Sequence, residues 1–453
     1  MLYNRHVKYE NLKAAFLYLL LLLIFSSPCF AKTELDEAAK PIDVDLVDID
    51  LKRYHKKHYF IMPDFKTENL KLYYIDGYKY KSPSIKPRTK AAKALINEIQ
   101  NAKESIYFAI YGIAEQPDIE QALINAKSRG VDIKGVVDMT QHNKNIYSGT
   151  ENLIAKLGNI HNDYEIADKN IKDDFDKEFD ITAAIMHNKF FVFDGEKVFT
   201  GSTNISNSGM GGYNTNVSVL INSSEVANLY TKEFNQMYNL KFHTIKEELT
   251  NNKNIQLDKY TQISVFFAPK NQVFANELHN LLKFAKETIY VEMFYLTNKY
   301  LINDLIRAKQ RGVDVKIILD ASSANNDFTA HTQLRSAGIP VKIENWGGKM
   351  HTKSAIIDNE YYVVGSMNWT GKAEFHNDEN LLIIQNPKLA QNCTKHFNHL
   401  WNKIPCKYLF ETPKAEGVES KYSCFDGMDN DHDGKIDCDD EDCLDCCRAK
   451  RIK

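Results

Sequence analysis

The chain has 453 residues, of which 43% are hydrophobic and 26% are charged. These ordinary globular proportions exclude a wholly disordered chain, and the length is sufficient for two or three domains. The formal net charge is −3, and the acidic excess lies after Glu411, so the long body before it is close to neutral. A neutral body gives no sign of the basic field that nucleic-acid-binding proteins usually carry, which weakens a nuclease interpretation without excluding it.

Residues 1–31 have the pattern of an export signal. Three basic residues precede an apolar run from Ala14 to Phe25, and Ser-Ser-Pro-Cys-Phe-Ala follows, ending at the small residue Ala31. The apolar run is short for a membrane-spanning helix, which needs about 20 residues, although an uncleaved anchor is the alternative. We therefore expect a cleaved signal peptide over residues 1–31 and a secreted or periplasmic protein. The following segment, residues 32–90, is rich in tyrosine and lysine and is expected to be an N-terminal extension.

An internal repeat follows this extension. Residues 104–138 and 287–320 both show a short apolar strand, a helix with apolar residues at helical spacing, an Arg-Gly-Val-Asp turn and a second apolar strand. Such units predict parallel strands joined by right-handed crossovers. We expect a first lobe over residues 91–240 and a second over residues 255–410. The first lobe carries an acidic insertion around residues 163–180, expected either to be a loop near the mouth of a site or to be a solvated surface insertion.

The second half of each repeat contains a shared motif. HNKFFVFDGEKVFTGSTN (187–204) and HTKSAIIDNEYYVVGSMN (351–368) align without a gap, and the motif regions span residues 181–208 and 345–372. Each copy reads His-x-Lys, four residues, Asp, six residues, Gly-Ser-x-Asn. The candidate catalytic residues are His187, Lys189, Asp194, His351, Lys353 and Asp358. The candidate substrate-binding residues are Ser202, Asn204, Ser366, Asn368 and Glu379.

Residue types in this motif suit phosphoryl transfer. Because positions i and i+2 of a strand share one face, each histidine projects together with its lysine. One imidazole can attack phosphorus and form a phosphohistidine, while the other protonates the leaving alkoxide and then activates water. The lysines and asparagines can stabilise charge on the non-bridging oxygens, so we expect no metal or cofactor in catalysis.

These paired motifs resemble the signature of the phospholipase D superfamily, over roughly residues 90–405. The resemblance implies an α/β (α+β sandwich) fold of two lobes related by a pseudo-twofold axis, each a mixed sheet flanked by helices. It implies that His187 is the nucleophile and His351 the general acid and base. Glu379 matches the downstream acid that holds a histidine in the family, but the aligned residue of the first lobe is Asn216, which leaves the assignment open. The motif aspartates of the family more often orient histidines or support the fold than touch substrate.

We therefore expect an exported phosphodiesterase, a phospholipase D that hydrolyses head groups from glycerophospholipids. One alternative is an exported, metal-independent endonuclease of the same superfamily. The other is a non-enzymatic module that binds surfaces in the presence of calcium. The expected partners are a phospholipid or nucleic-acid phosphodiester, with peripheral membrane contact, and the chain is expected to be a monomer.

The C-terminal tail, residues 421–447, is rich in cysteine and aspartate. Its sequence places aspartates at alternate positions, a glycine at the bend and an aspartate at the twelfth position, close to the pattern of a calcium-binding loop. The candidate ligands are Asp429, Asp431, Asp433, Asp437 and Asp440. The alternative is a disordered acidic tail. We expect a structural or adhesive role, with disulfides among the seven late cysteines and one thiol left over.

Overall fold

The structure is a computed structural model, and it describes residues 64–139, 144–166, 170–172, 178–180, 184–326 and 329–451. The expected signal peptide lies outside these residues. Every helix within them is too short or too polar to cross a lipid bilayer.

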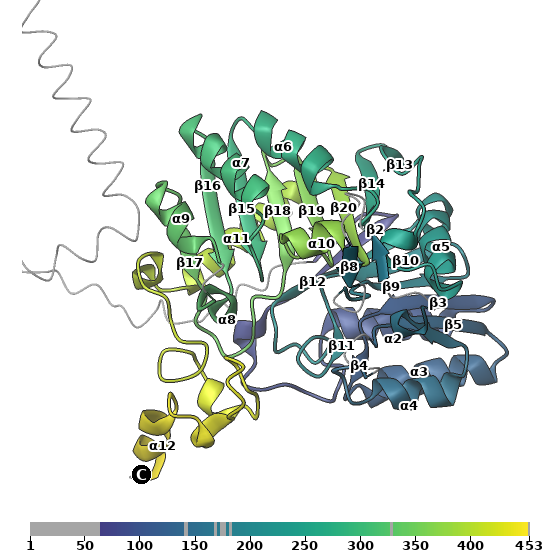
Figure 1. Cartoon of the computed structure of the whole chain (residues 1–453), viewed down its shortest axis with the longest axis horizontal. Coiled ribbons are helices and arrows are strands. Elements are labelled where there is room, and N and C mark those ends of the chain that lie inside the picture. The colour runs from purple at the N-terminus through teal and green to yellow at the C-terminus, as the bar shows by residue number, and fades with distance from the viewer. Residues whose placement is uncertain are drawn as a thin grey trace, which may run out of the picture. The chain divides into compact units, whose positions relative to one another are not determined.

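Two eight-stranded sheets form the two lobes (Figure 1). In spatial order, the first sheet contains β1 (Phe65–Lys66), β2 (Leu70–Ile75), β12 (Asn216–Asn222), β10 (Lys197–Gly201), β9 (Lys189–Phe193), β3 (Ser105–Ile110), β5 (Asp132–Val137) and β6 (Ile160–Asn162). The second contains β13 (Ile255–Asp258), β14 (Thr261–Ala268), β20 (Glu379–Gln385), β19 (Tyr361–Gly365), β18 (Lys353–Ile357), β15 (Thr288–Met293), β16 (Asp314–Leu319) and β17 (Val341–Ile343).

The two strand orders correspond position by position. In each sheet the last three strands run parallel and the remaining pairs are antiparallel, so both sheets are mixed. The predicted repeat of two lobes, each a mixed sheet flanked by helices, is thus confirmed. Two short ribbons are added to the first lobe, β4 (Ile113–Ala114) with β11 (Ile205–Ser206) and β7 (Asn170–Lys172) with β8 (Glu178–Asp180). The β7–β8 ribbon belongs to the acidic insertion.

Helices cover both sheets and also separate them. The outer face of the first sheet packs against α2 (Lys90–Asn101), α3 (Pro117–Ser128) and α4 (Thr150–Leu157). The outer face of the second packs against α6 (His279–Phe284), α7 (Lys299–Gln310) and α9 (His331–Ser336) (Figure 1). Between the sheets lie α5 (Ser224–Tyr238) and α11 (Pro387–Lys403). The short helices are α8 (Ala321–Ala324), α10 (Gly371–Phe375) and, in the tail, α12 (Leu444–Arg451).

The repeated Arg-Gly turn ends α3 and α7 as the sequence predicts. Gly130 and Gly312 have φ angles of 88° and 94°, which a glycine adopts without strain. The arginine before each glycine has a further role. Arg129 donates from Nη2 to the carbonyl of Ile99 at 3.0 Å, and Arg311 does the same to Leu282 at 2.9 Å. The turn therefore ties each crossover helix to the helix before it.

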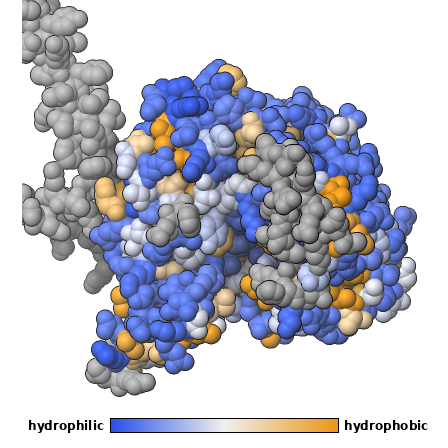
Figure 2. All heavy atoms as spheres, viewed as in Figure 1, coloured by the Kyte–Doolittle hydropathy of each residue, from blue (hydrophilic) through white to orange (hydrophobic). Residues whose placement is uncertain are grey.

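One hydrophobic core is shared by the two lobes. It contains residues from the inner faces of both sheets together with α5 and α11. Strand β9 shows how the faces are divided, because Phe190 and Val192 join this shared core while Phe191 and Phe193 point into the outer core of the first lobe. With apolar side chains packed into these layers, hydrophilic residues cover most of the face shown in Figure 2.

The first lobe begins earlier in the chain than expected. Strand β2 pairs with β12 in the first sheet, in the same way that β14 pairs with β20 in the second. Part of the segment expected to be an extension is therefore an integral edge of the lobe, and the boundary predicted at residue 91 is too late. The sequence signal was available at the start of this strand, where Leu70 and Leu72 alternate with Lys71 and Tyr73.

Burial in the shared core predicts a large loss of stability when one of its phenylalanines is truncated. Phe397 in α11 is fully buried between the sheets, whereas Phe410 is 78% exposed. Phe397→Ala should lower the free energy of unfolding in urea by about 3–5 kcal/mol, because it leaves a cavity in the shared core beside the rings of Tyr290 and Trp401. Phe410→Ala is the matched control and should stay within about 0.5 kcal/mol of wild type. Equal effects of the two substitutions would contradict the burial of Phe397 in this core.

Candidate active site

His187 is held by the lobe to which it does not belong. Its ring Nδ1 lies 2.9 Å from both carboxylate oxygens of Glu379, at the start of β20 in the second lobe. Its backbone N–H donates to the carbonyl of Asp378 at 2.9 Å. Because Nδ1 is occupied by the carboxylate, Nε2 is the ring nitrogen left to react.

His351 is held in the reciprocal way. Its Nδ1 lies 3.0 Å from Oδ1 of Asn216, at the start of β12 in the first lobe, and its backbone N–H donates to the carbonyl of Thr215 at 2.9 Å. The two lobes thus exchange their orienting residues across the interface. The exchange is unequal, because His187 faces a carboxylate while His351 faces a neutral amide.

The two lysines of the motif complete a buried cationic cluster. Lys189 and Lys353 are 3% and 1% exposed, and each donates from Nζ to the backbone carbonyl of the histidine two residues before it at 2.7 Å. Aromatic rings flank each pair. The Tyr111 ring lies 5.4 Å from the His187 ring, and the Phe294 ring lies 5.2 Å from the His351 ring.

Burial among like charges shifts the titration of all four groups. Burial lowers the pKa of His187 to about 4, while the Glu379 charge opposes this shift and the Lys189 charge adds to it. Burial lowers the pKa of Lys189 to about 7. The pKa of His351 falls well below its usual value through burial and then through the charges of Lys353 and Lys189. The groups of one lobe therefore act on those of the other, as expected for one joint site.

Such a cluster favours a bound anion. Four basic groups held together away from water destabilise one another while all are charged. A phosphodiester carries negative charge on two non-bridging oxygens, which would offset that repulsion and raise the pKa of each of the four groups. Among the residues that the structure describes, Glu379 is the one acidic side chain that contacts a histidine of this cluster.

Each motif serine hydrogen-bonds to the side chain that orients one of the histidines. Ser202 Oγ donates to Asn216 Oδ1 at 2.8 Å, and Ser366 Oγ donates to Glu379 Oε2 at 2.5 Å. Of the predicted substrate-binding residues, Glu379 therefore contacts His187 directly, and the two serines hydrogen-bond to the side chains that orient the histidines. By contrast, Oδ1 of Asn204 and of Asn368 is buried without a hydrogen-bond partner among the described residues. The spare capacity on these oxygens is for accepting a hydrogen bond, and Nδ2 of Asn204 donates to the hydroxyl of Tyr147 at 2.8 Å.

The motif aspartates lie at the far ends of the strands from the histidines. Asp194 follows the last residue of β9, and its carboxylate accepts backbone N–H bonds from Lys103, Glu104 and Ser105 at 2.8–3.1 Å. Burial opposes ionisation there, but these amides lower the pKa of Asp194. Asp358 binds residues 286–288 in the same way. Their placement among the catalytic residues is therefore wrong, because they fasten the loop before the neighbouring strand.

Sequence reasoning missed a buried network behind His187. The Asp378 carboxylate lies 2.9 Å from Nδ1 of His243 and 2.7 Å from Nζ of Lys246. Asp163, part of the acidic insertion, accepts the backbone N–H of Met186 at 3.0 Å. The insertion is thus partly built into the site, contrary to the interpretation of a solvated surface loop. The adjacency of Asp378 and Glu379 in the sequence was the one available signal.

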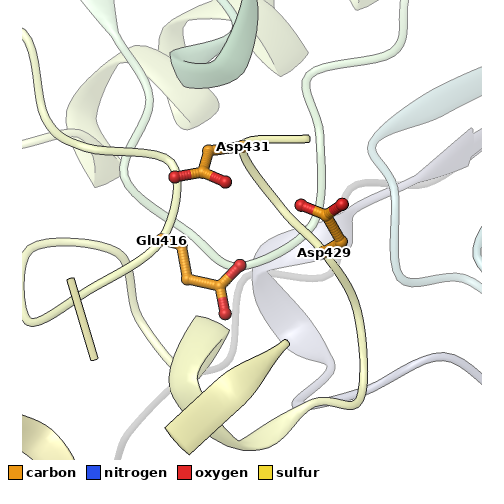
Figure 3. Close-up of side chains that lie close together, drawn as sticks. All are labelled: Glu416, Asp429 and Asp431. Atoms are coloured by element: carbon orange, nitrogen blue, oxygen red, sulfur yellow. The ribbon is translucent and has the colours of Figure 1, made fainter. Parts of the chain in front are cut away.

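The tail brings four of its five candidate ligands together. Single carboxylate oxygens of Glu416, Asp429 and Asp431 lie within 4.8 Å of one another, and those of Asp431, Asp433 and Asp440 do the same. Figure 3 shows the carboxylates of Glu416, Asp429 and Asp431 facing a common space. Asp437 is not among them, because its carboxylate accepts the backbone N–H groups of residues 426 and 427. Glu416, which precedes the loop in sequence, was missed.

Two disulfides staple the tail, Cys424–Cys443 and Cys438–Cys447. The expected disulfides are thus present. Among the described residues two thiols are free, Cys393 in the core and Cys446 in the tail, where the sequence led us to expect one. The tail also contacts both lobes, since Trp346 pairs with Lys421 and Tyr213 donates a hydrogen bond to Asp426.

Solved structures and curated proteins resemble this chain over parts of its length. Phosphatidylserine synthase of Haemophilus influenzae Rd KW20 is 15% identical, covers 76% of this chain and 88% of its own, and superposes with a TM-score of 0.55, which supports the fold. The phospholipase D family member Nuc from Salmonella typhimurium is 30% identical over 32% of this chain and 96% of its own, with a TM-score of 0.30.

Among the curated relatives, phospholipase D of Rickettsia prowazekii is 30% identical over 162 residues, which are 36% of this chain and 78% of the relative. Phospholipase D of Rickettsia conorii is 33% identical over 29% of this chain and 66% of the relative. Mitochondrial cardiolipin hydrolase of Chlamydomonas reinhardtii is 33% identical over 26% of this chain and 53% of the relative. The chain thus spans from about half to about four fifths of these relatives' length.

A family model described as "Cardiolipin synthase, PLD-like domain" matches residues 95–238 and 278–401. These two segments make up more than half of the chain, and each contains one of the two His-x-Lys motifs. The chain therefore belongs to the phospholipase D superfamily.

Proposed function

We propose that the protein is a phosphodiesterase that hydrolyses the head group from glycerophospholipids through a phosphohistidine. The observation that carries this proposal is the pair of histidines, each held at Nδ1 by the opposite lobe and each beside a buried lysine. This arrangement supplies a nucleophile, an acid and two cations around one phosphorus.

The reaction follows two displacements. Nε2 of His187 attacks phosphorus, the bond from phosphorus to the head-group oxygen breaks, and His351 gives that oxygen its proton. The lysine ammonium groups, together with Nδ2–H groups of Asn204 and Asn368, donate hydrogen bonds to the non-bridging oxygens. His351 then takes a proton from water, the hydroxide attacks phosphorus, and the phosphorus–nitrogen bond breaks to release phosphatidic acid and restore both rings.

The unequal partners of the two histidines support a different role for each. A phosphorylated imidazole that keeps its proton on Nδ1 is a cation, and the Glu379 carboxylate stabilises that charge on His187. The Asn216 amide fixes the ring of His351 without adding negative charge, so the protonated ring stays a strong acid. These partners support His187 as the nucleophile and His351 as the acid, the assignment that the family resemblance implies.

Lipid is favoured over nucleic acid by two observations. The body of the chain is close to neutral, which gives no long-range attraction for a polyanion. The curated relatives reported above are named phospholipase D and cardiolipin hydrolase. Peripheral contact with a membrane and a monomeric state remain part of this proposal.

Export is proposed from the pattern of residues 1–31 and is in keeping with the two disulfides of the tail, which persist in oxidising compartments. Protein recovered outside the cytoplasm should begin at residue 32 by N-terminal sequencing, and a chain that retains residue 1 would contradict cleavage.

For the tail we propose that the bound cation is calcium, because hard oxygen ligands at this spacing suit a large divalent cation.

A substrate panel tests the proposed chemistry. Purified protein in calcium should release head groups and phosphatidic acid from liposomes, and His187→Ala should lose about a thousandfold or more of kcat, because the nucleophile is gone. Asp194→Asn should keep kcat near wild type while lowering the thermal midpoint, because its carboxylate binds only backbone amides. Mass spectrometry of the released products measures kcat, and thermal denaturation measures the midpoint. Cleavage of oligonucleotides but not liposomes would make the protein a nuclease, and cleavage of neither would favour a binding module.

A pH profile tests which histidine is the acid. Asn216→Asp places a carboxylate beside His351 and should raise its pKa by about one unit or more. Since a general acid must be protonated, activity is lost as the pH rises through that pKa, and the basic limb of the kcat/KM profile should move to higher pH. A shift of the acidic limb would instead show that His351 must be deprotonated, as a nucleophile is, and would reverse the assignment.

A further inference from the structure

We propose that cation binding by the acidic tail controls the catalytic centre, because the tail is docked on the two chain segments that hold His351. The effect on catalysis rests on the proposed phosphodiesterase activity, whereas the structural coupling does not. The segments, called here the docking segments, are residues 213–216 of the first lobe and residues 345–351 of the second.

The cation site has a feature beyond its cluster of carboxylates. Asp440 is 2% exposed, and its Oδ2 is buried with no hydrogen-bond partner among the described residues. One oxygen of the same side chain lies within 4.8 Å of those of Asp431 and Asp433. A buried, unpartnered carboxylate oxygen next to two other carboxylates is unfavourable unless a cation neutralises it. The arrangement therefore indicates a divalent-cation site.

Buried Glu416 extends this site toward the body of the protein. Its carboxylate accepts the backbone N–H groups of Asn430 and Asp437 at 2.8 and 2.9 Å, so it fixes both ends of the acidic loop. The Cys424–Cys443 disulfide encloses the same loop. The hydrogen bonds to Glu416 and the disulfide restrict movement within the loop. Binding or loss of a cation therefore affects the contacts between the loop and the two lobes.

The first of these contacts reaches Lys349. His432 lies between the ligands Asp431 and Asp433 in sequence, and its Nε2 contacts Nζ of Lys349. The Lys349 ammonium also lies 5.7 Å from the centre of the Phe294 ring, the ring beside His351. One side chain thus spans the distance from the cation loop to the wall of the active site.

The second contact reaches the first lobe. Tyr213 is almost fully buried, and its hydroxyl donates a hydrogen bond to the carboxylate of Asp426. Gly347 and Gly348 lie against it so closely that an added Cβ would come within 2.0 Å of Tyr213 Oη and 1.9 Å of Tyr213 O, respectively. The tail, the first lobe and the second lobe therefore meet at this tyrosine without room for displacement.

The third contact is backbone pairing. The N–H of Lys421 donates to the carbonyl of Asn345 at 3.0 Å, and Asn345 Nδ2 donates to the carbonyl of Glu419 at 3.3 Å. Trp346 and Lys421 form a parallel bridge. The start of the second docking segment is thus an edge to which the tail adds a strand-like stretch.

From these contacts the connection to His351 is direct. The N–H of Thr215 donates to the carbonyl of Lys349 at 2.8 Å, and Lys349 N–H donates to Asn214 Oδ1 at 3.0 Å. The next bond in this ladder is the one from His351 N–H to Thr215, beside the Asn216 amide that orients the ring. Loss of the tail contacts would loosen the same ladder that positions the general acid.

The expected coupling follows from charge. Without a cation, the five carboxylates repel one another. This repulsion destabilises the docked conformation of the loop, in which His432 contacts Lys349 and Asp426 contacts Tyr213. Calcium removes this repulsion and stabilises the docked loop. Couplings between sites in proteins are commonly about 5- to 150-fold in affinity, and we expect at least tenfold in kcat/KM here.

A structural measurement tests the coupling without any substrate. Calcium chloride titrated into the chelator-treated full chain should bind at one or more sites by calorimetry. Hydrogen exchange should then slow in residues 213–216 and 345–351, and this slowing should disappear in Asp431→Asn. Asp445→Asn is the matched control, since Asp445 is exposed and outside both ligand groups. Calcium binding without slower exchange in these segments, or no binding at 1 mM calcium, would overturn the inference.

An activity measurement tests its consequence. Hydrolysis of bis(4-nitrophenyl) phosphate, or of the substrate found by the panel, should fall at least tenfold in EGTA and recover with calcium. Asp431→Asn should stay low in calcium, and Asp445→Asn should behave as wild type. The double variant Tyr213→Phe, His432→Ala should bind calcium but respond to it less.

The failures of the two proposals are distinguishable. Activity that is equal in EGTA and in calcium would overturn the control of catalysis, even where calcium binds. A chain that is inactive in every condition but shows calcium-dependent protection of the docking segments would refute the proposed function and leave the structural coupling in place.

Discussion

The structure depends on a reciprocal exchange across the lobe interface, in which each histidine ring is oriented by a residue of the opposite lobe. Neither lobe can form a complete site alone, because Glu379 belongs to one and His187 to the other. The helices α5 and α11 secure this exchange by filling a core that both sheets line. The duplicated sequence is therefore one catalytic unit made of two halves, and the pseudo-twofold axis relates the halves of a single anion site.

The two lobes differ in the side chain that contacts the catalytic histidine. A carboxylate stands behind His187 and a neutral amide behind His351, while the serine behind each partner is the same. Burial and the nearby lysine charges lower the pKa of both rings. A bound phosphodiester anion would raise the pKa of His351 and so favour the protonated form that acts as the acid. The same strand order in both lobes, combined with a different partner for each histidine, explains how one motif can supply two different functions.

Sequence alone predicted the elements that local pattern encodes. The Arg-Gly turns, the strands of the motif and the pairing of each histidine with its lysine follow from spacing and residue type. Tertiary partners could not be predicted: Asp194 matches the motif as well as His187 does, yet only the fold places it at the far end of β9. Glu416 joins the acidic cluster from outside the loop pattern, and Tyr213 meets the tail across more than 200 residues of chain.

The central claim is that His187 carries the phosphoryl group, and trapping the intermediate tests it most directly. In the His351→Ala variant the first displacement can occur with a substrate whose leaving group needs no protonation, such as a 4-nitrophenyl phosphodiester, but no base remains to activate water. Alkaline quenching followed by peptide mass spectrometry should then show a phosphoryl adduct on His187. An adduct on His351 in the His187→Ala variant, with none on His187 in the converse experiment, would contradict the account.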